Sequence, residues 1–162
     1  MTYLYCLEPA VGQSLPDFCS LYETQYGVDR DVHKVVYEPE FIATLLYDMW
    51  HQGNLYYFVT ARTHTGVLAA CMAVMYYPED KEFVFSHLVT HELHRQQGLA
   101  KGIIKASVPF LKATGLAVRI RNHKRMNVIP EKYFLDLGFT EKLLPFKQRW
   151  HKEYKLRYIL DI

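Results

Sequence analysis

The spacing of hydrophobic positions in the first third of the chain predicts one short strand and two helices. Residues 2–7 alternate between the two sides of a chain in the way a short strand does. Ser14 then stands where it can cap a helix, and the apolar side chains that follow recur at helical spacing until Gly27. A second helix is predicted from Pro39, which suits a first helical turn, to Gly53, which ends the repeat.

The middle of the chain predicts strands instead. Residues 54–62 and 66–77 are rich in β-branched, aromatic and apolar side chains, and the sequence THTG between them is typical of a turn, so together they predict a β-hairpin. Residues 82–89, EFVFSHLV, alternate as a strand with two unlike faces does. One face is expected to carry Phe83, Phe85, His87 and Val89, and the other Val84, Ser86 and Leu88.

The period changes to that of an amphipathic helix after Gly98 and changes back after Gly115. Residues 116–121 then alternate as a strand, and the helix before them is long enough to connect two parallel strands. Residues 130–139 predict a short helix, and residues 142–162 predict two further strands. We therefore expect an α/β fold with a mixed sheet.

Composition narrows the class of protein. A chain of 162 residues, half of them hydrophobic, is expected to form a single domain over residues 1–162. A net charge of only +2 argues against a polyanionic partner spread over the whole surface. Three separated cysteines make neither a disulfide framework nor a zinc pattern. With no secretory leader or membrane span in the sequence, we expect a soluble cytoplasmic protein.

Residues 90–104, THELHRQQGLAKGII, predict an anion site. The strand before them ends near Val89 and the helix begins after Gly98, so the amides of the first helical turn point out of the helix. Glycine allows a phosphate to approach the backbone, and Arg95, Lys101 and Lys105 add positive charge. An ordinary loop-to-helix turn explains the same residues. The segment is neither a nucleotide P-loop nor a G-x-G-x-x-G motif.

Two segments carry a resemblance to a known family. RQQGLA, residues 95–100, resembles the Q/R-x-x-G-x-G/A motif of the GNAT superfamily of acyl-CoA-dependent N-acyltransferases, with a strand before it and a helix after it. NVIPEKYFLDLGF resembles the family's N-x-x-A-x-x-x-Y-x-x-x-G-F segment, with Asn127, Gly138 and Phe139 in place. The resemblance implies a GNAT fold with splayed central parallel strands, and acetyl transfer from acetyl-CoA, as co-substrate, to an amine acceptor.

The resemblance also implies which residues contact the cofactor. The pantetheine arm would pair with the strand end, and the pyrophosphate would lie on the amides of the turn beside a positive charge. Carried over by motif position, the cofactor-binding residues are Leu88, Val89, Thr90, Arg95, Gln96, Gln97, Gly98, Leu99, Ala100, Lys101 and Asn127.

Acyl transfer needs a base for the amine, and two residues are candidates. In members of the family that act on protein lysines, a glutamate thirteen residues before the motif's arginine is the base, and that position is Glu82. A solvated glutamate at a strand start is the alternative. His87 is the second candidate, because imidazole titrates near neutral pH; a core or rim histidine is the alternative.

The departing thiolate needs a proton, and here the sequence departs from the family pattern. The family's tyrosine position is Phe134 in this chain, and Tyr133 lies beside it, about 100° around a helix. Tyr133 is the candidate general acid; otherwise water protonates the thiolate, or catalysis is weak. The oxyanion donor is expected to be a backbone amide at the splay, most simply that of Val89.

Other patterns are less specific. His87, His91 and His94 lack a supporting carboxylate pattern, so we expect no metal site.

An acidic and aromatic rim would suit a cationic amine, although the same acids could cap helices or face water; it comprises Tyr26, Asp29, Asp31, Tyr37, Glu38 and Trp50. The basic and aromatic tail 147–158 would suit RNA or an acidic protein, but a solvated hairpin explains it equally well, and we expect no nucleic-acid partner.

Two classes of function follow from the sequence. The first is an N-acetyltransferase that moves an acetyl group directly to a primary amine of a small molecule or a protein. The second is a catalytically weak or inactive GNAT-fold protein that binds acyl-CoA and acts through a protein or RNA partner; Phe134 favours it. The sequence does not identify the acceptor, and a homodimer stays open.

Overall fold

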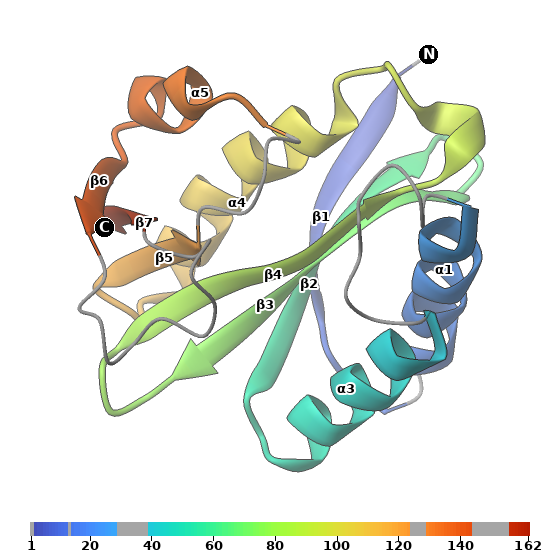
Figure 1. The fold of residues 1–162 in the computed structure, drawn as a ribbon, viewed down its shortest axis with the longest axis horizontal. Coiled ribbons are helices and arrows are strands. Elements are labelled where there is room, and N and C mark those ends of the chain that lie inside the picture. Colours follow the sequence, from blue (N-terminus) through green and yellow to red (C-terminus); the bar gives the residue numbers. More distant parts are fainter. Residues whose placement is uncertain (1, 13, 29–38, 124–128, 144–155) are drawn as a thin grey trace.

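The computed structural model describes residues 2–12, 14–28, 39–123, 129–143 and 156–162 (Figure 1). Within these ranges the chain forms a mixed α/β fold, as expected. The elements, in chain order, are β1 (Tyr3–Pro9), α1 (Leu15–Val28), α3 (Pro39–His51), β2 (Leu55–Thr63), β3 (Leu68–Tyr77), β4 (Glu82–Thr90), a 3-10 turn (Glu92–His94), α4 (Leu99–Thr114), β5 (Arg119–His123), α5 (Glu131–Asp136), β6 (Thr140–Leu143) and β7 (Leu156–Asp161).

The strands form one seven-stranded sheet in the order β1-β2-β3-β4-β5-β7-β6. Strands β4 and β5 are parallel, and the other neighbours are antiparallel. The predicted hairpin is β2–β3, and the predicted crossover helix is α4, which connects β4 to β5. The strand expected over residues 116–121 begins later, at Arg119.

Helices cover the two faces of the sheet differently. We call the side on which α4 packs the α4 face; its core includes Ile103, Leu111, Ile120 and the α5 residue Phe134. We call the opposite side the α1 face, where α1 and α3 pack against the β2–β4 part of the sheet. In Figure 1 these two helices lie at one end of the sheet, and β5, β6 and β7 lie at the other.

Strand β4 contains a bulge at His87, which changes the predicted faces. Met72 of β3 pairs with Leu88 and Ala73 pairs with Ser86, so β4 holds one extra residue at this step. His87 has a φ of 44°, in the left-handed region. Beyond the bulge Leu88 packs against the α4-face core and Val89 joins the α1-face core. The prediction that Val89 shares a face with Phe83 and Phe85 is therefore wrong, because the extra residue reverses the alternation.

Strands β4 and β5 separate at the same level. Among the described residues they pair at four positions, from Glu82 with Arg119 to Phe85 with Asn122. Residues 86–90 continue to pair with β3, up to Thr90 with Ala70. The second half of β4 therefore borders a gap in the sheet, as the resemblance to splayed parallel strands implied.

Candidate active site

The turn before α4 presents backbone amides outward, beside the gap. Gly98 is the N-cap residue, with a φ of 73° that favours glycine. The amide of Gly102 donates to the Gly98 carbonyl at 2.9 Å, so the three amides before it, at residues 99–101, have no intrahelical acceptor. Gln96 also has a positive φ, of 61°. This turn can bind a phosphate through its amides and through the positive end of the helix dipole.

A buried side chain of α1 holds the loop in front of this turn. The Oε1 atom of Gln25 accepts hydrogen bonds from the Glu92 amide at 2.7 Å and from Nη2 of Arg95 at 3.1 Å. Gln25 is only 3% exposed. Nε of Arg95 also donates to the Thr90 carbonyl at 3.4 Å. Arg95 therefore connects the loop to the end of β4, and no pattern in the sequence indicated the role of Gln25.

The first turn of α4 packs closely under a tyrosine of β1. A Cβ atom added to Gly102 would lie 2.0 Å from the Tyr5 hydroxyl oxygen, so any larger residue there would require the Tyr5 side chain to move. Lys101 is exposed, and its ammonium lies 5.5 Å from the centre of the Tyr133 ring. A glycine inside a helix signals such a close approach, because glycine otherwise destabilises the helix by about 1 kcal/mol. Gly102 was therefore a sequence signal for a close approach, although it did not identify Tyr5 as the partner.

The backbone of β4 faces the gap at alternate residues. The amide of His91 donates to the Ala69 carbonyl of β3 at 2.8 Å. Because backbone groups alternate along a strand, the amide of Val89 also points toward β3, and those of Leu88 and Thr90 point toward the gap. The expected oxyanion donor, the Val89 amide, thus faces away from the gap, and the Leu88 amide is the group on the correct side.

His87 lies at the vertex of the gap, on the α1 side. Its side chain is buried, and its Nδ1 atom forms a short hydrogen bond with the Ser86 hydroxyl. The Tyr22 hydroxyl donates to the His87 carbonyl, and the two rings meet edge to face with centroids 6.2 Å apart. Helix α1 therefore holds both the backbone and the ring of the bulge residue.

Glu82 lies at the other end of β4 and is bound by two arginines of β5. Its side chain is only 6% exposed, and its two carboxylate oxygens lie 3.4 Å from Nη1 of Arg119 and 3.2 Å from Nε of Arg121. A solvated glutamate, the alternative considered from the sequence, is excluded. Glu82 and His87 are both buried, but they are five residues apart on one strand, about 16 Å.

Helix α5 directs Tyr133 and Phe134 to different places. Phe134 is buried and stacks on Tyr158 of β7 with ring centroids 4.6 Å apart. Tyr133 points toward α4, and its hydroxyl donates to the Lys101 carbonyl at 2.7 Å. Burial and, to a smaller extent, the neighbouring Tyr5 raise the pKa of Tyr133 above its ordinary value. Tyr133 thus keeps its proton at neutral pH and lies against the first turn of α4.

The remaining predicted residues have other roles or lie outside the described ranges. Asn127 and residues 29–38 of the proposed rim are outside them. His91 caps the 3-10 turn by accepting from the Leu93 amide, and His94 bonds to the Tyr3 hydroxyl. In the described ranges no three His, Cys, Asp or Glu residues are grouped to hold a metal ion. No helix of those ranges has the length and apolar character needed to cross a membrane.

Comparisons with known proteins agree with this arrangement. The family model of the acetyltransferase (GNAT) family matches residues 15–139. Among solved structures, a GNAT family N-acetyltransferase from Escherichia coli in complex with CoA is 14% identical, with a TM-score of 0.66, and the match covers 99% of this chain and 83% of that one.

Two further structures resemble the chain over its length. Spermidine N-acetyltransferase from Vibrio cholerae, in complex with CoA and spermine, is 13% identical with a TM-score of 0.67, over 97% of this chain and 95% of that one. A protein of the GNAT family from Desulfovibrio desulfuricans is 13% identical with a TM-score of 0.69, over 99% of both chains. No curated protein sequence matches the chain. Because the family match spans most of its length, the chain belongs to the GNAT family of acetyltransferases.

Proposed function

We propose that this protein transfers an acetyl group from acetyl-CoA directly to a primary amine. The observation that carries the proposal is the junction of two features: the amide-rich turn at Gly98 and the gap in the sheet that begins beside His87. The turn suits a pyrophosphate, and the gap offers the only break between β4 and β5 in the described residues through which a thioester could reach the other face. CoA and acetyl-CoA are present in complexes of similar structures.

The cofactor and the acceptor would approach from opposite faces. The Gly98 turn belongs to α4, so acetyl-CoA would enter on the α4 face, with its pantetheine arm along Leu88 and Thr90. Acetyl-CoA would occupy that entrance, which leaves the α1 face for the amine. His87 lies on this side at the vertex of the gap. We therefore assign the general base to His87, whereas the two ion pairs of Glu82 favour a structural role.

Two further groups would complete the reaction. The Leu88 amide points toward the gap, and we assign it to the oxyanion that forms on the thioester carbonyl. Tyr133 is on the cofactor side, and we assign it to protonation of the departing thiolate. In this step the amine nitrogen forms a bond to the acetyl carbon and gives up a proton to His87, the carbon–sulfur bond breaks, and the sulfur takes a proton from Tyr133. His87 then releases its proton and Tyr133 regains one through solvent, which restores both groups.

The core cysteines support direct transfer over an acetylated enzyme. Burial raises the pKa of Cys71 to about 12 and that of Cys19 to about 11, with a smaller contribution from Glu23 at Cys19. Both thiols stay protonated at neutral pH, and a protonated thiol is a poor nucleophile for a thioester. Neither core thiol is therefore suited to carry the acetyl group, which favours direct attack by the amine.

Acetyl-CoA binding and turnover test this proposal separately. We expect millimolar acetyl-CoA to raise the melting temperature, and an amine to release free CoA thiol at a rate that depends on both substrates. Absence of a thermal shift would contradict the cofactor assignment. Binding without thiol release, against small amines, proteins and aminoacyl-tRNA, would support the second candidate function, a non-catalytic acyl-CoA-binding protein, which Phe134 in place of a tyrosine favours.

A further inference from the structure

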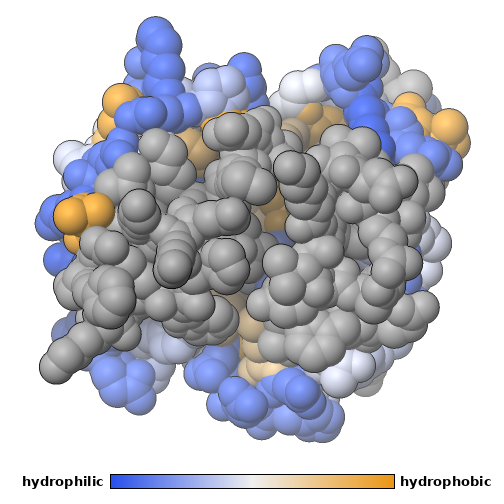
Figure 2. All heavy atoms as spheres, viewed as in Figure 1, coloured by the Kyte–Doolittle hydropathy of each residue, from blue (hydrophilic) through white to orange (hydrophobic). Residues whose placement is uncertain are grey.

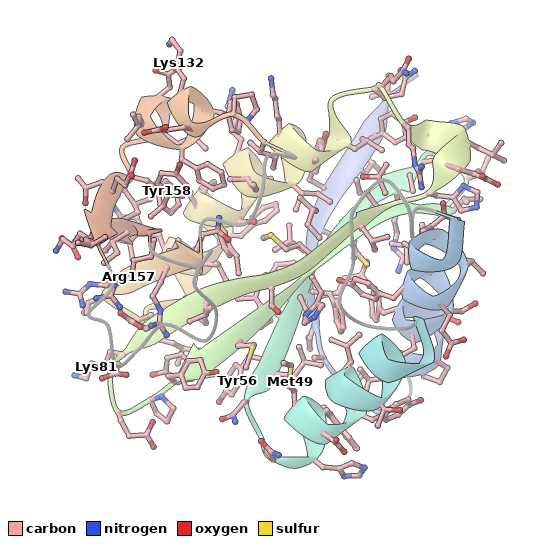
Figure 3. The ribbon with its side chains drawn as sticks, viewed as in Figure 1. Met49, Tyr56, Lys81, Lys132, Arg157 and Tyr158 are labelled. Atoms are coloured by element: carbon pink, nitrogen blue, oxygen red, sulfur yellow. The ribbon has the colours of Figure 1, made fainter. Side chains whose placement is uncertain are left out.

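An arginine of β7 extends the basic surface around Glu82. Ile120, Tyr158 and Leu160 of strands β5 and β7 pack on the α4 face. Because side chains alternate along a strand, Arg119 and Arg121 of β5 and Arg157 of β7 point to the α1 face, where Glu82 meets the first two. Figure 3 shows Arg157 at the β5–β7 end of the sheet, away from α1 and α3.

The carboxylates of this cluster already form ion pairs with the arginines of β5, so Arg157 adds a positive charge that these pairs do not balance. Glu82 pairs with Arg119 and Arg121, and Asp161 pairs with Arg119 at 3.1 Å. Nε of Arg157 is buried and has no hydrogen-bond partner in the described part of the chain. Burial and then the charge of Arg121 lower the pKa of Arg157, although Glu82 opposes this shift. A buried guanidinium nitrogen without a hydrogen-bond acceptor is costly, and an anionic ligand that accepts from it would offset that cost.

Arg157 lies at the level of the gap. The last paired positions of β4 and β5 are Phe85 and Asn122, and the next residue of β5, His123, pairs with Arg157. Arg157 is therefore at least two strand spacings, about 10 Å, from the part of β4 that holds the bulge, because β4 and β5 separate at this level. An extended guanidinium arm covers much of that distance, so a small molecule can contact both Arg157 and the gap.

Resting on the function proposed above, we propose that the acceptor amine also carries an anionic group, a carboxylate or a phosphate, which Arg157 binds while the amine lies at the gap. A guanidinium binds either anion through two parallel hydrogen bonds. A polyamine, such as the spermine bound to the Vibrio cholerae protein, would instead place a second cation near Arg157. The cluster thus favours a different acceptor class from the cationic amine considered from the sequence.

Matched acceptors of equal chain length test the proposal by turnover. We suggest ω-amino carboxylates, ω-aminoalkyl phosphates, amino alcohols and diamines, each with three to six carbons. We expect kcat/KM to be at least tenfold higher for one or both anionic series than for the amino alcohols, and lowest for the diamines. The carboxylate and phosphate series distinguish the two anions. Equal or better turnover of diamines would overturn the proposal and leave the acetyltransferase function intact.

Variants of Arg157 identify the group responsible. We expect Arg157→Gln to raise the KM of the preferred anionic acceptor at least tenfold, with the KM values of the amino alcohol and of acetyl-CoA unchanged. Arg157→Lys keeps the charge and loses the paired hydrogen bonds, so it should lie between the two. Lys132→Gln, an exposed cation of α5, is the matched control and should change nothing. An equal loss for every acceptor in Arg157→Gln would contradict the proposal.

A binding measurement decides the matter even without turnover. Inorganic phosphate and butyrate, titrated at constant ionic strength into protein saturated with acetyl-CoA, should raise the melting temperature of the wild type and of Lys132→Gln, and not that of Arg157→Gln. If no amine is acetylated but this difference is found, the acetyltransferase proposal fails and the anion site stands. If neither anion produces a shift that depends on Arg157, the anion site is refuted.

Discussion

The two halves of β4 have the same strand conformation and opposite roles. Residues 82–85 pair with strands on both sides, and Glu82 among them is neutralised by two arginines. Residues 86–90 pair with β3 and border the gap on the other side. The bulge residue His87 separates the halves and shifts their side chains by one position. The first half joins the two parts of the sheet, and the second exposes backbone groups to a ligand.

The two halves of β4 differ mainly in the partners of their backbone amides and carbonyls, and less in the burial of their side chains. Both halves are rich in buried residues, as the exposures of 5% for Phe85 and 6% for Val89 show. A parallel neighbour satisfies the amides of the first half, whereas amides of the second half can bind a cofactor. The molecule therefore retains a core around the gap, while the second half of β4 lacks a parallel neighbour in the described residues. On the face drawn in Figure 2, most of the described residues around the edge are hydrophilic, with a few hydrophobic ones among them.

His87→Asn should have the largest effect and tests the role of the second half. Asparagine tolerates the left-handed conformation that His87 adopts, so the bulge is retained while the base is lost. We expect kcat to fall by about 10²–10⁴-fold, with the KM of acetyl-CoA unchanged, and the acidic limb of the pH–rate profile to disappear. Steady-state kinetics of CoA thiol release would measure this. A kcat within threefold of the wild type would remove His87 from the mechanism.

Glu82→Gln probes the first half and should affect stability instead. Losing the charge leaves Arg119 and Arg121 without their shared carboxylate, and both retain some solvent exposure, so we expect a cost of about 2 kcal/mol, below the range for fully buried pairs. Denaturant unfolding would measure it, with Lys132→Gln as the control for removal of an exposed charge. The kcat per folded molecule should stay within threefold. A hundredfold loss of kcat would instead restore Glu82 as the base.

Most of the fold could be predicted from the sequence, because the spacing of hydrophobic residues and the positions of glycines identify most helices and strands. Gly98 and Gly115 bracket α4 as predicted, and both have positive φ values. The bulge was not readable. An extra residue at His87 leaves the apparent alternation of EFVFSHLV intact, and only the register with β3 shows that two residues of β4 oppose one step of the partner.

The candidate site could be predicted from the sequence only where residues close together in the chain form it. The Gly98 turn depends on neighbouring residues, so its amides could be inferred from RQQGLA. Gln25, Tyr5 and Arg157 act from distant segments that the fold brings together, and a single sequence contains no record of those contacts. Glu82 was placed correctly on a strand, but its two arginine partners on β5 could not be identified before the parallel register was known.

Gly98→Val tests whether the turn that follows the second half binds the cofactor through its backbone. Nothing lies near the added side chain, but the left-handed φ of 73° costs a β-branched residue about 1–2 kcal/mol, and relief of that strain would turn the amides away. We expect the Kd of acetyl-CoA to rise about tenfold, measured by calorimetry. Gly66→Val is the matched control, since Gly66 has a φ of 88° and open space in the β2–β3 turn. Equal effects of both variants on the Kd would refute the assignment.

Tyr133→Phe should have the smallest effect. It tests whether a residue on the α4 face takes part in the reaction. Loss of a general acid usually costs 10²–10⁴-fold, but a thiolate departs with little help, so we expect a fall in kcat of about fivefold. A general acid works while protonated, and because the pKa of Tyr133 is raised by burial, the alkaline decline of the wild-type rate should lie above the ordinary pKa of a tyrosine. The variant should lose that decline while acetyl-CoA binds as before.

Tyr76→Phe is the control for this last variant, because the Tyr76 hydroxyl also donates to a backbone carbonyl, that of Leu116, and lies away from the Gly98 turn. If both variants lose the same small amount of stability and only Tyr133→Phe changes kcat and its pH profile, the proton donor is on α5, one position from the place the family motif gives it. If Tyr133→Phe leaves kcat and the profile unchanged, water protonates the thiolate, and the catalytic groups are confined to the bulged half of β4.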